Sequence, residues 1–404
     1  MKRALIIILT TFAFVACSKD DVVMEYRGEA IDFNASNGNI TRADAQKPTF
    51  TDNVPQFHVW GYHINGASSS VKMNDVLVEK TDEGVWEYSP KQYWPKEGVI
   101  DFVAINPTKT EVEAGKYKDH RTNQNLVTLS HDGFATNADR KITVTAQRKD
   151  ATMNYSPCLP DLIYSVTEDQ SRQSTAVGMH FRHAMAQVKC KVKNENEDFL
   201  LEFRPNCAVE IHNVKSTGMF TLPSSTTVAD SNDSNTYGTW KVNDDDHATF
   251  DIFTKKNVSI NGFENLTDDP DREGYIDTGY FMDTSKPSAM FIPCSVPEWD
   301  RSKPASQQNG AYFVVYCRVS YQRGTMAQRY YLLGDKDEAN NIDRYDPIYV
   351  PATVNWQPGY CYTYCFAPGK GVGYTETGEP STVPLTFSLD VTPYTNGGTI
   401  TTPL

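Results

Sequence analysis

Few side chains in this sequence have the spacing that a catalytic or metal-binding site requires. His180 and His183 are three residues apart in a strand-like segment, so they project from opposite faces and cannot share a metal ion. Cys361 and Cys365 share a face, but an extended strand separates them too far for a tetrahedral zinc pair. The sequence contains no nucleophile elbow, zinc-protease motif or phosphate-binding loop. We therefore expect no catalytic residues, no cofactor and no metal centre, in a protein that is not an enzyme.

The acidic segment from Asp269 to Gly274 is a candidate cation site. Its carboxylates alternate before a glycine, as in the first half of a calcium-binding loop. The twelfth position of such a loop would be Tyr280, where a calcium loop has a bidentate Glu. A solvated acidic loop is therefore favoured, and calcium binding is the alternative.

Cys17 is the residue with the clearest chemical role. Lys2 and Arg3 precede an apolar run from Ala4 to Val15, and small Ala16 then leads to Cys17. This pattern is typical of a secretory signal, and the run is shorter than the roughly 20 residues of a spanning helix. The placement of the cysteine resembles a bacterial lipobox, in which it becomes the lipidated first residue. A multi-chain lipid would anchor the protein to a bilayer, and an ordinary signal peptide is the alternative.

Composition and charge limit the classes of partner. The chain of 404 residues carries a formal net charge of −13, with 38 Lys and Arg against 51 Asp and Glu. Nucleic-acid binding depends on clustered Lys and Arg, and no basic stripe is present, so we expect no nucleic-acid partner. The 22 Tyr and 19 Phe are residue types that favour strands.

Lipidation of Cys17 would leave an odd number of cysteines. These are Cys158, Cys190, Cys207, Cys294, Cys317, Cys361 and Cys365. An odd set cannot pair fully, and several members lie within apolar runs, where a free cysteine behaves as a small buried hydrophobe. Buried thiols are therefore favoured over a disulfide framework, and the sequence leaves any pairing open.

Period-two alternation dominates both halves of the chain, whereas helical periodicity is almost absent. Strand-like segments such as residues 57–62 and 99–104 are separated by Gly, Pro, Asn and Asp. The second half repeats this pattern, for example at residues 186–192 and 312–321. The spacing is typical of β-sandwiches, so we predict an all-β fold.

A polar stretch at residues 167–174 is the candidate domain boundary, because a new strand pattern begins after it. The predicted division has four parts. They are a signal peptide at residues 1–16, a lipidated tether at 17–42, an N-terminal β-sandwich at 43–175 and a C-terminal β-sandwich at 176–404.

Several segments, in this order along the chain, resemble one protein family. They are the lipobox at Cys17, Phe33 followed by Thr41-Arg42-Ala43, and residues 57–62, 86–95, 181–188 and 356–364. Together they resemble the fimbrillin family of surface lipoproteins, which are major and minor subunits of pili in anaerobic Gram-negative bacteria.

The resemblance implies two transthyretin-like β-sandwich domains in tandem and export as a lipoprotein to the surface of the outer membrane. It also implies assembly into a fimbrium by strand exchange. In such pili, a protease with Arg specificity removes the first strand, and another subunit's C-terminal strand fills the space. Arg42, followed by Ala43, fits the cut by position. The alternative is that Arg42 lies in a tether that is never cut.

Both ends of the chain contain strands that fit such an exchange. Ile31, Phe33 and Ala35 alternate onto one face, as in an edge strand over a core. Removal of this strand would expose apolar surface and unpaired backbone groups. A candidate donor strand at residues 383–392 alternates more strongly. Its apolar face consists of Leu385, Phe387, Leu389 and Val391. The alternative is that it is the last strand of its own domain.

The expected partners are other pilus subunits, the outer membrane through the N-terminal lipid, and a ligand on a host or bacterial surface. The alternative function is a monomeric surface lipoprotein that binds glycans by stacking sugars on aromatic side chains. The available tryptophans are Trp60, Trp86, Trp94, Trp240, Trp299 and Trp356. Aromatic side chains in strands more often fill cores, which favours the pilus subunit or adhesin.

Overall fold

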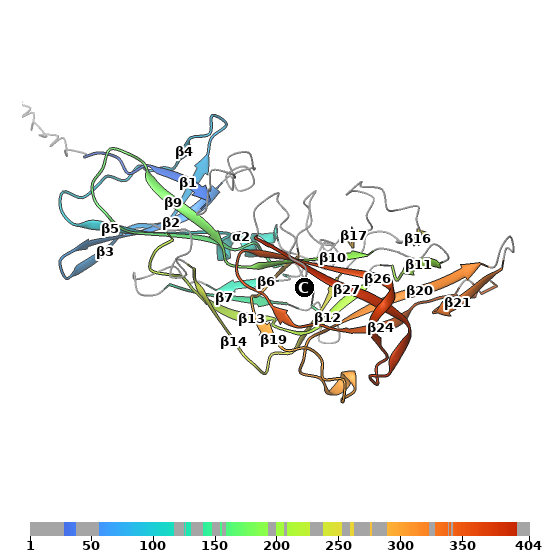
Figure 1. The fold of residues 1–404 in the computed structure, drawn as a ribbon. Helices are drawn as coiled ribbons and strands as arrows, with labels where there is room; N and C mark the ends of the chain where they lie inside the picture. The colour runs from blue at the N-terminus through green and yellow to red at the C-terminus, as the bar shows by residue number, and fades with distance from the viewer. Residues whose placement is uncertain are drawn as a thin grey trace, which may run out of the picture.

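The computed structural model describes most of the chain after its N-terminal segment. The described residues are 28–37, 56–116, 125, 127–130, 140–147, 154–155, 159–192, 199–205, 208–226, 237–252, 259–261, 275–276, 289–322, 328–337, 339–340 and 342–393. They form an elongated molecule, with the first strands at one end and the later strands extending toward the other (Figure 1).

β-strands make up nearly all of the regular structure, which confirms the all-β fold. The helical segments are α2 (Lys109–Glu111), the π-helical turn η2 (Val112–Lys116) and the 3-10 turn η4 (Ala305–Gln307). Strand β7 (Lys141–Ala146) shows the physical basis of the strands, because Ile142 and Val144 are buried while Lys141 is exposed. The tandem transthyretin-like arrangement stays a prediction.

A seven-stranded sheet lies at one end of the molecule, with β1 at its edge in the order β1-β9-β8-β5-β2-β3-β4. Its strands are β1 (Phe33–Asn37), β2 (Gln56–Asn65), β3 (Ser68–Lys80), β4 (Trp86–Glu87), β5 (Val99–Asn106), β8 (Ile163–Gln170) and β9 (Val177–His183). β1 and β9 run parallel, whereas the other neighbours are antiparallel. The edge strand is therefore held differently from the rest of the sheet.

A four-stranded sheet packs on one face of the seven-stranded sheet. Its order is β14-β13-β7-β6, with β6 (Val127–Ser130), β13 (Thr217–Thr221) and β14 (Thr239–Val242) joining β7. The rings of Tyr164 in β8 and Phe220 in β13 lie 4.8 Å apart in a core that both sheets share. Segments distant in the sequence therefore build this layer together.

The largest sheet has twelve strands, whose main path is β15-β12-β20-β24-β26-β10-β17. Its strands are β10 (Ala186–Val192), β11 (Phe199–Phe203), β12 (Val209–Val214), β15 (Ala248–Ile252), β16 (Ser259–Asn261), β17 (Tyr275–Ile276), β18 (Ala289–Phe291), β20 (Tyr312–Gln322), β21 (Arg329–Leu333), β24 (Asp346–Pro351), β26 (Tyr360–Tyr374) and β27 (Pro380–Pro393). Two small sheets pair β19 (Ser295–Val296) with β25 (Val354–Asn355), and β22 (Asp335–Asp337) with β23 (Ile342–Arg344).

The chain passes from the seven-stranded to the twelve-stranded sheet between β9 and β10. β9 pairs with β8 and β1, whereas β10 pairs in parallel with β26. The change of sheet thus lies on the C-terminal side of residue 175, and the four-stranded sheet combines strands from both sides of that residue. The division into folding units at 43–175 and 176–404 stays a prediction.

Two hydrophobic cores lie on opposite faces of the seven-stranded sheet. The first, here called the N-terminal core, contains Phe57, Phe102 and Phe181. The second, here called the shared core, contains Val103 and extends through the four-stranded and twelve-stranded sheets. Phe102 and Val103 are consecutive in β5, so their side chains project to opposite faces. Both faces of this sheet are therefore covered.

Candidate functional site

The predicted site residues fall in three parts of the chain. Cys17, Arg42 and Ala43 lie outside the described residues. Ile31 precedes β1, and Phe33 is its first residue. The candidate donor residues Leu385, Phe387, Leu389 and Val391 lie in β27. The structure thus places the two candidate exchange strands in different sheets, with β1 at the edge of the seven-stranded sheet and β27 in the twelve-stranded one.

β1 is paired on one side with β9. The register places Phe33 opposite Val177 and Ala35 opposite Met179. The amide of Val177 also donates a 2.7 Å hydrogen bond to the carbonyl of Asp32. β9 is also paired with β8, so it would stay in the sheet if β1 were lost. Its backbone groups that now bond to β1 would then be unpaired.

Alternate side chains around β1 enter the N-terminal core. Ile31, Phe33 and Ala35 are 0%, 4% and 6% exposed, whereas Asp32 and Asn34 are exposed to solvent. This is the alternation that the sequence predicted. Three consecutive inward positions of this strand therefore close one edge of the core.

Phe33 occupies an aromatic site, here called the Phe33 socket, formed by Phe57, Tyr88 and Phe102. The ring centroids lie 6.3, 5.7 and 5.3 Å from that of Phe33, and the rings of Phe57 and Phe102 meet it edge to face. Each such aromatic pair stabilises the folded protein by about 0.5–1.5 kcal/mol, in addition to the contribution from burying the apolar surface of the rings. The socket therefore fits an aromatic ring better than a smaller aliphatic side chain.

The segment of residues 88–94, here called the strand clamp, holds the chain just before β1 from the other side. The amide of Ile31 donates to the carbonyl of Gln92 at 2.9 Å, and the amide of Trp94 donates to the carbonyl of Glu29 at 3.0 Å. These antiparallel bonds are made by main-chain groups. These two bonds therefore do not depend on which side chains residues 29 and 31 carry.

The hydroxyl of Tyr88 adds a side-chain hydrogen bond to the clamp. It donates to the carbonyl of Ile31 at 2.6 Å and accepts from the amide of Gln92 at 3.2 Å. Burial raises the pKa of Tyr88 to about 12, so the hydroxyl retains the proton that it donates.

Replacement Tyr88→Phe is expected to lower the free energy of unfolding by about 1–3 kcal/mol, because it leaves the buried carbonyl of Ile31 without this donor. Urea denaturation measures the change. Tyr360→Phe is the matched control, since the Tyr360 side chain is 38% exposed, and it should change stability by less than about 0.5 kcal/mol. Equal losses in the two variants would contradict a specific role for Tyr88.

Two exposed ion pairs accompany the clamp. Lys91 Nζ lies 2.7 Å from a carboxylate oxygen of Asp32, and Arg172 Nε lies 3.1 Å from one of Glu29. All four side chains are more than a third exposed. Exposed pairs of this kind contribute at most about 1 kcal/mol each, so the apolar contacts of Phe33 dominate the binding of this strand.

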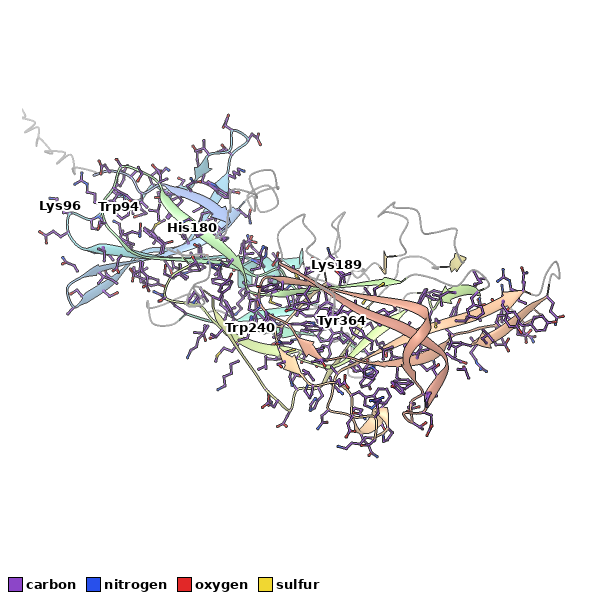
Figure 2. All side chains as sticks on the ribbon, in the orientation of Figure 1. Trp94, Lys96, His180, Lys189, Trp240 and Tyr364 are labelled. Atoms are coloured by element: carbon purple, nitrogen blue, oxygen red, sulfur yellow. The ribbon has the colours of Figure 1, made fainter. Side chains whose placement is uncertain are left out.

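Arg182 is a buried cation beside the end of β1. It follows Phe181, which pairs with Asn37, the last residue of β1. Arg182 is 6% exposed and lies over the ring of Tyr237 at 4.3 Å. Its Nε and Nη2 atoms have no hydrogen-bond partner among the described residues. Burial, and then the nearby charge of Arg182, lower the pKa of His180, which Figure 2 labels in this part of the molecule.

β27 pairs antiparallel with β26 of the same chain. Leu389 lies opposite Tyr364, and Phe387 lies opposite Phe366. Leu389 and Val391 are partly buried against the shared core. Donation of this strand to another subunit would therefore require β27 to leave β26.

The other candidates for chemistry do not assemble into a site. Asp269–Gly274 lies outside the described residues. His183 pairs with Asp161, with 2.9 Å between Nδ1 and a carboxylate oxygen. Within the described ranges, no group of three or more His, Cys, Asp and Glu side chains is placed to hold a metal ion. No helix in the same ranges is long and apolar enough to cross a membrane.

The tryptophans do not form an exposed platform for sugars. Trp60, Trp86, Trp94, Trp299 and Trp356 are at most 6% exposed. Trp240 is partly buried, and its indole nitrogen donates to the carbonyl of Ala184 at 2.6 Å. The six side chains therefore fill or border cores, so the tryptophans do not supply the exposed platform that the glycan-binding alternative requires.

The cysteines that the structure describes are buried and form no disulfide. They are Cys190, Cys294, Cys317, Cys361 and Cys365. Burial is the largest cause of the raised thiol pKa values, which are about 12 for Cys294 and Cys317. The expectation of buried thiols is confirmed for these five residues, whereas Cys158 and Cys207 lie outside the described part of the chain.

The clamp and Arg182 were not identified as functional from the sequence, although both lie in segments that carry the family resemblance. The bonds between residues 29–31 and 92–94 join segments with no shared local pattern. Arg182 does leave a signal, because it is a charged residue within the apolar strand pattern of residues 177–188. A cation in such a run predicts a specific partner.

Comparisons with known proteins identify a family. No curated protein matches the sequence. A fimbrial protein from Bacteroides vulgatus aligns over 91% of this chain and 100% of its own, with 14% identity and a TM-score of 0.48. The C-terminally truncated tip fimbrial protein Mfa3 from Porphyromonas gingivalis aligns over 89% and 98%, with 10% identity and a TM-score of 0.32.

A family model described as fimbrillin-like matches residues 41–261. This match covers more than half of the 404 residues. The resemblance predicted from the sequence is therefore confirmed, and the chain belongs to the fimbrillin-like family.

Proposed function

We propose that this protein is a subunit or accessory adhesin of a cell-surface pilus, exported as a lipoprotein acylated at Cys17 and assembled by strand exchange after cleavage between Arg42 and Ala43. Membership of the fimbrillin-like family supports the pilus role. The observation that carries the exchange is the position of β1, an edge strand that closes the N-terminal core and precedes Arg42 in the chain.

Cleavage after Arg42 would separate the strand of Ile31 and Phe33 from the rest of the protein. Its inward side chains would leave a site lined by β9, the Phe33 socket and the strand clamp. Each large apolar side chain that refills this site contributes about 1.5–3 kcal/mol. A strand with alternating apolar residues would therefore bind tightly there.

The proposed occupant is the C-terminal strand of another subunit, through Leu385, Phe387, Leu389 and Val391. Donor and acceptor are different surfaces of each subunit, so the contact is heterologous. Such a contact does not close on itself and yields filaments. The partners are therefore other copies of this chain or related subunits at the outer membrane.

Trypsin treatment of the purified protein tests this function. We expect cleavage after Arg42, followed by filaments in electron micrographs and by large species in gel filtration. Arg42→Ala should stay uncleaved at this position and monomeric, because trypsin needs the basic side chain. A protein that is cut after Arg42 yet stays monomeric under all conditions would overturn the strand exchange.

Replacement Cys17→Ala is expected to abolish acylation and membrane retention, because the thiol of Cys17 is the proposed lipid attachment point. Incorporation of radiolabelled palmitate into the protein in whole cells measures this effect. A control variant, Cys158→Ala, should incorporate label normally. Labelling of the Cys17→Ala variant would show that the lipid is attached elsewhere.

A further inference from the structure

We propose that the strand which replaces β1 docks in one register, with Phe387 in the Phe33 socket and Asp390 beside Arg182. This inference rests on the strand exchange proposed above, and it adds the residues that determine where the incoming strand stops. Two features of the acceptor site, the Phe33 socket and Arg182, select this register, and a third, the strand clamp, is compatible with it.

The Phe33 socket selects Phe387 among the apolar residues of the donor. Registers that keep the apolar face inward bring Leu385, Phe387, Leu389 or Val391 to the position of Phe33. Only Phe387 restores the ring that meets Phe57, Tyr88 and Phe102. The other three leave part of the socket empty, and an unfilled cavity is destabilising. Leu389 would then lie opposite Met179, whose unbranched side chain can adjust to it.

The strand clamp accepts the proline of the donor in this register. With Phe387 at the position of Phe33, Leu385 takes the position of Ile31 and Pro384 that of Ala30. The main-chain bonds described between this segment and the clamp use the amide of Ile31 and the carbonyls of Glu29 and Ile31, and not the amide of Ala30. Pro384 therefore loses no bond to the clamp. A shift by one residue would bring it to the position of Ile31 and remove the donor to Gln92.

Arg182 provides the second feature that selects this register. The register brings Asp390 to the position of Ser36, which pairs with His180. Arg182 lies two residues further along β9 on the same face, within reach of a diagonal neighbour. A carboxylate there can accept hydrogen bonds from the guanidinium nitrogens that have no partner among the described residues. A shift of the donor by two residues in either direction also keeps its apolar face inward, but it brings Ser388 or Thr392 to this position instead.

Disulfide trapping between subunits tests the register. The acceptor carries Gly178→Cys, and separate donors carry Thr386→Cys, Ser388→Cys, Asp390→Cys or Thr392→Cys. Gly178 pairs with Asn34, so the proposed register brings Ser388 opposite it. A Cβ at Gly178 meets only the ring of His180, at 3.4 Å. Neighbouring strands about 4.8 Å apart satisfy the geometry of a disulfide.

The uncleaved chain supplies the matched control. Asn34→Cys with Gly178→Cys should form a disulfide within one chain, because these residues are already paired. In filaments of the cleaved protein, we expect the Ser388→Cys donor to give the dominant linked dimer on non-reducing gels, with the linked peptide identified by mass spectrometry. Filaments linked mainly through another donor position would overturn the register while leaving strand exchange intact. Absence of filaments in every combination, including the unsubstituted chain, would overturn the exchange itself.

A double-mutant cycle tests the contact with Arg182 separately. Asp390→Asn should speed dissociation of the donor strand about tenfold. This factor corresponds to the lower end of the range for loss of a hydrogen bond to a charged group. The same change should have little effect on filaments whose acceptor carries Arg182→Gln, if the two side chains interact. Equal effects in both backgrounds would show that Asp390 does not contact Arg182. Circular dichroism confirms that each variant is folded.

Discussion

Phe33→Ala is expected to lower the free energy of unfolding by about 3–5 kcal/mol, the range for removal of a buried aromatic side chain. Phe33 is 4% exposed and contacts three aromatic rings that come from β2, β5 and the strand clamp. The neighbouring backbone is fixed by β9 on one side and the clamp on the other, so the cavity cannot collapse easily. Urea denaturation of the uncleaved protein measures the loss.

Asn34→Ala is the control for this measurement. Asn34 lies next to Phe33 in β1, but its side chain is exposed, and its replacement should change stability by no more than about 0.5 kcal/mol. A loss below about 1 kcal/mol for Phe33→Ala would show that the first strand contributes little to the N-terminal core. So small a contribution from Phe33 could not explain tight binding of a replacement strand at the same site.

The pattern of β1 could be predicted because it is local. Alternation of Ile31, Phe33 and Ala35 identifies a strand with one buried face, whatever that face packs against. Its partner could not be predicted in the same way. β1 pairs in parallel with β9, more than a hundred residues away in the sequence, and nothing in the two patterns specifies that choice.

The layer formed by β6, β7, β13 and β14 shows the same limit. Each of its strands is short. β7 precedes the point in the sequence where the chain passes from the seven-stranded to the twelve-stranded sheet, and its partner β13 follows that point. A polar stretch such as residues 167–174 indicates a turn, but it does not show which strands meet after the turn. Part of that stretch, up to Gln170, is strand β8 itself.

The proposed acceptor site depends on contacts of this non-local kind. The Phe33 socket takes rings from three separate segments, and the clamp is joined by backbone bonds to the residues just before β1. Backbone bonds carry no residue signature, so the sequence could identify the strand that is held but not what holds it. Arg182 is the exception, because a charge inside an apolar strand is visible before its surroundings are known.

The state of β27 in the isolated chain affects how assembly proceeds. β27 forms an extended antiparallel pair with β26, and Leu389 and Val391 pack against the shared core. In the proposed exchange, a subunit would hold β27 against its own β26 until a vacant acceptor site competes for it. The exchange would then depend on the difference in binding free energy between these two sites, and the Phe33 socket would favour the acceptor.

Truncation before Thr382 is expected to abolish filaments while leaving cleavage after Arg42 intact. The truncated chain lacks all four apolar residues of the donor, and each would contribute about 1.5–3 kcal/mol on burial in the acceptor. Trypsin followed by gel filtration and electron microscopy measures the outcome, which should be a cleaved monomer in place of filaments.

Truncation also removes the partner of β26, so loss of filaments alone could reflect a damaged twelve-stranded sheet. Phe387→Ala in the full-length chain separates the two causes, because it keeps the backbone of β27 and removes only the ring proposed for the Phe33 socket. Loss of a ring from an aromatic site costs about 3–5 kcal/mol, so filaments of this variant should form poorly and dissociate far faster. Ser388→Ala, one residue along, should assemble normally. Filaments that form equally well from the truncated chain would exclude β27 as the donor, because that chain lacks every residue of the proposed donor strand.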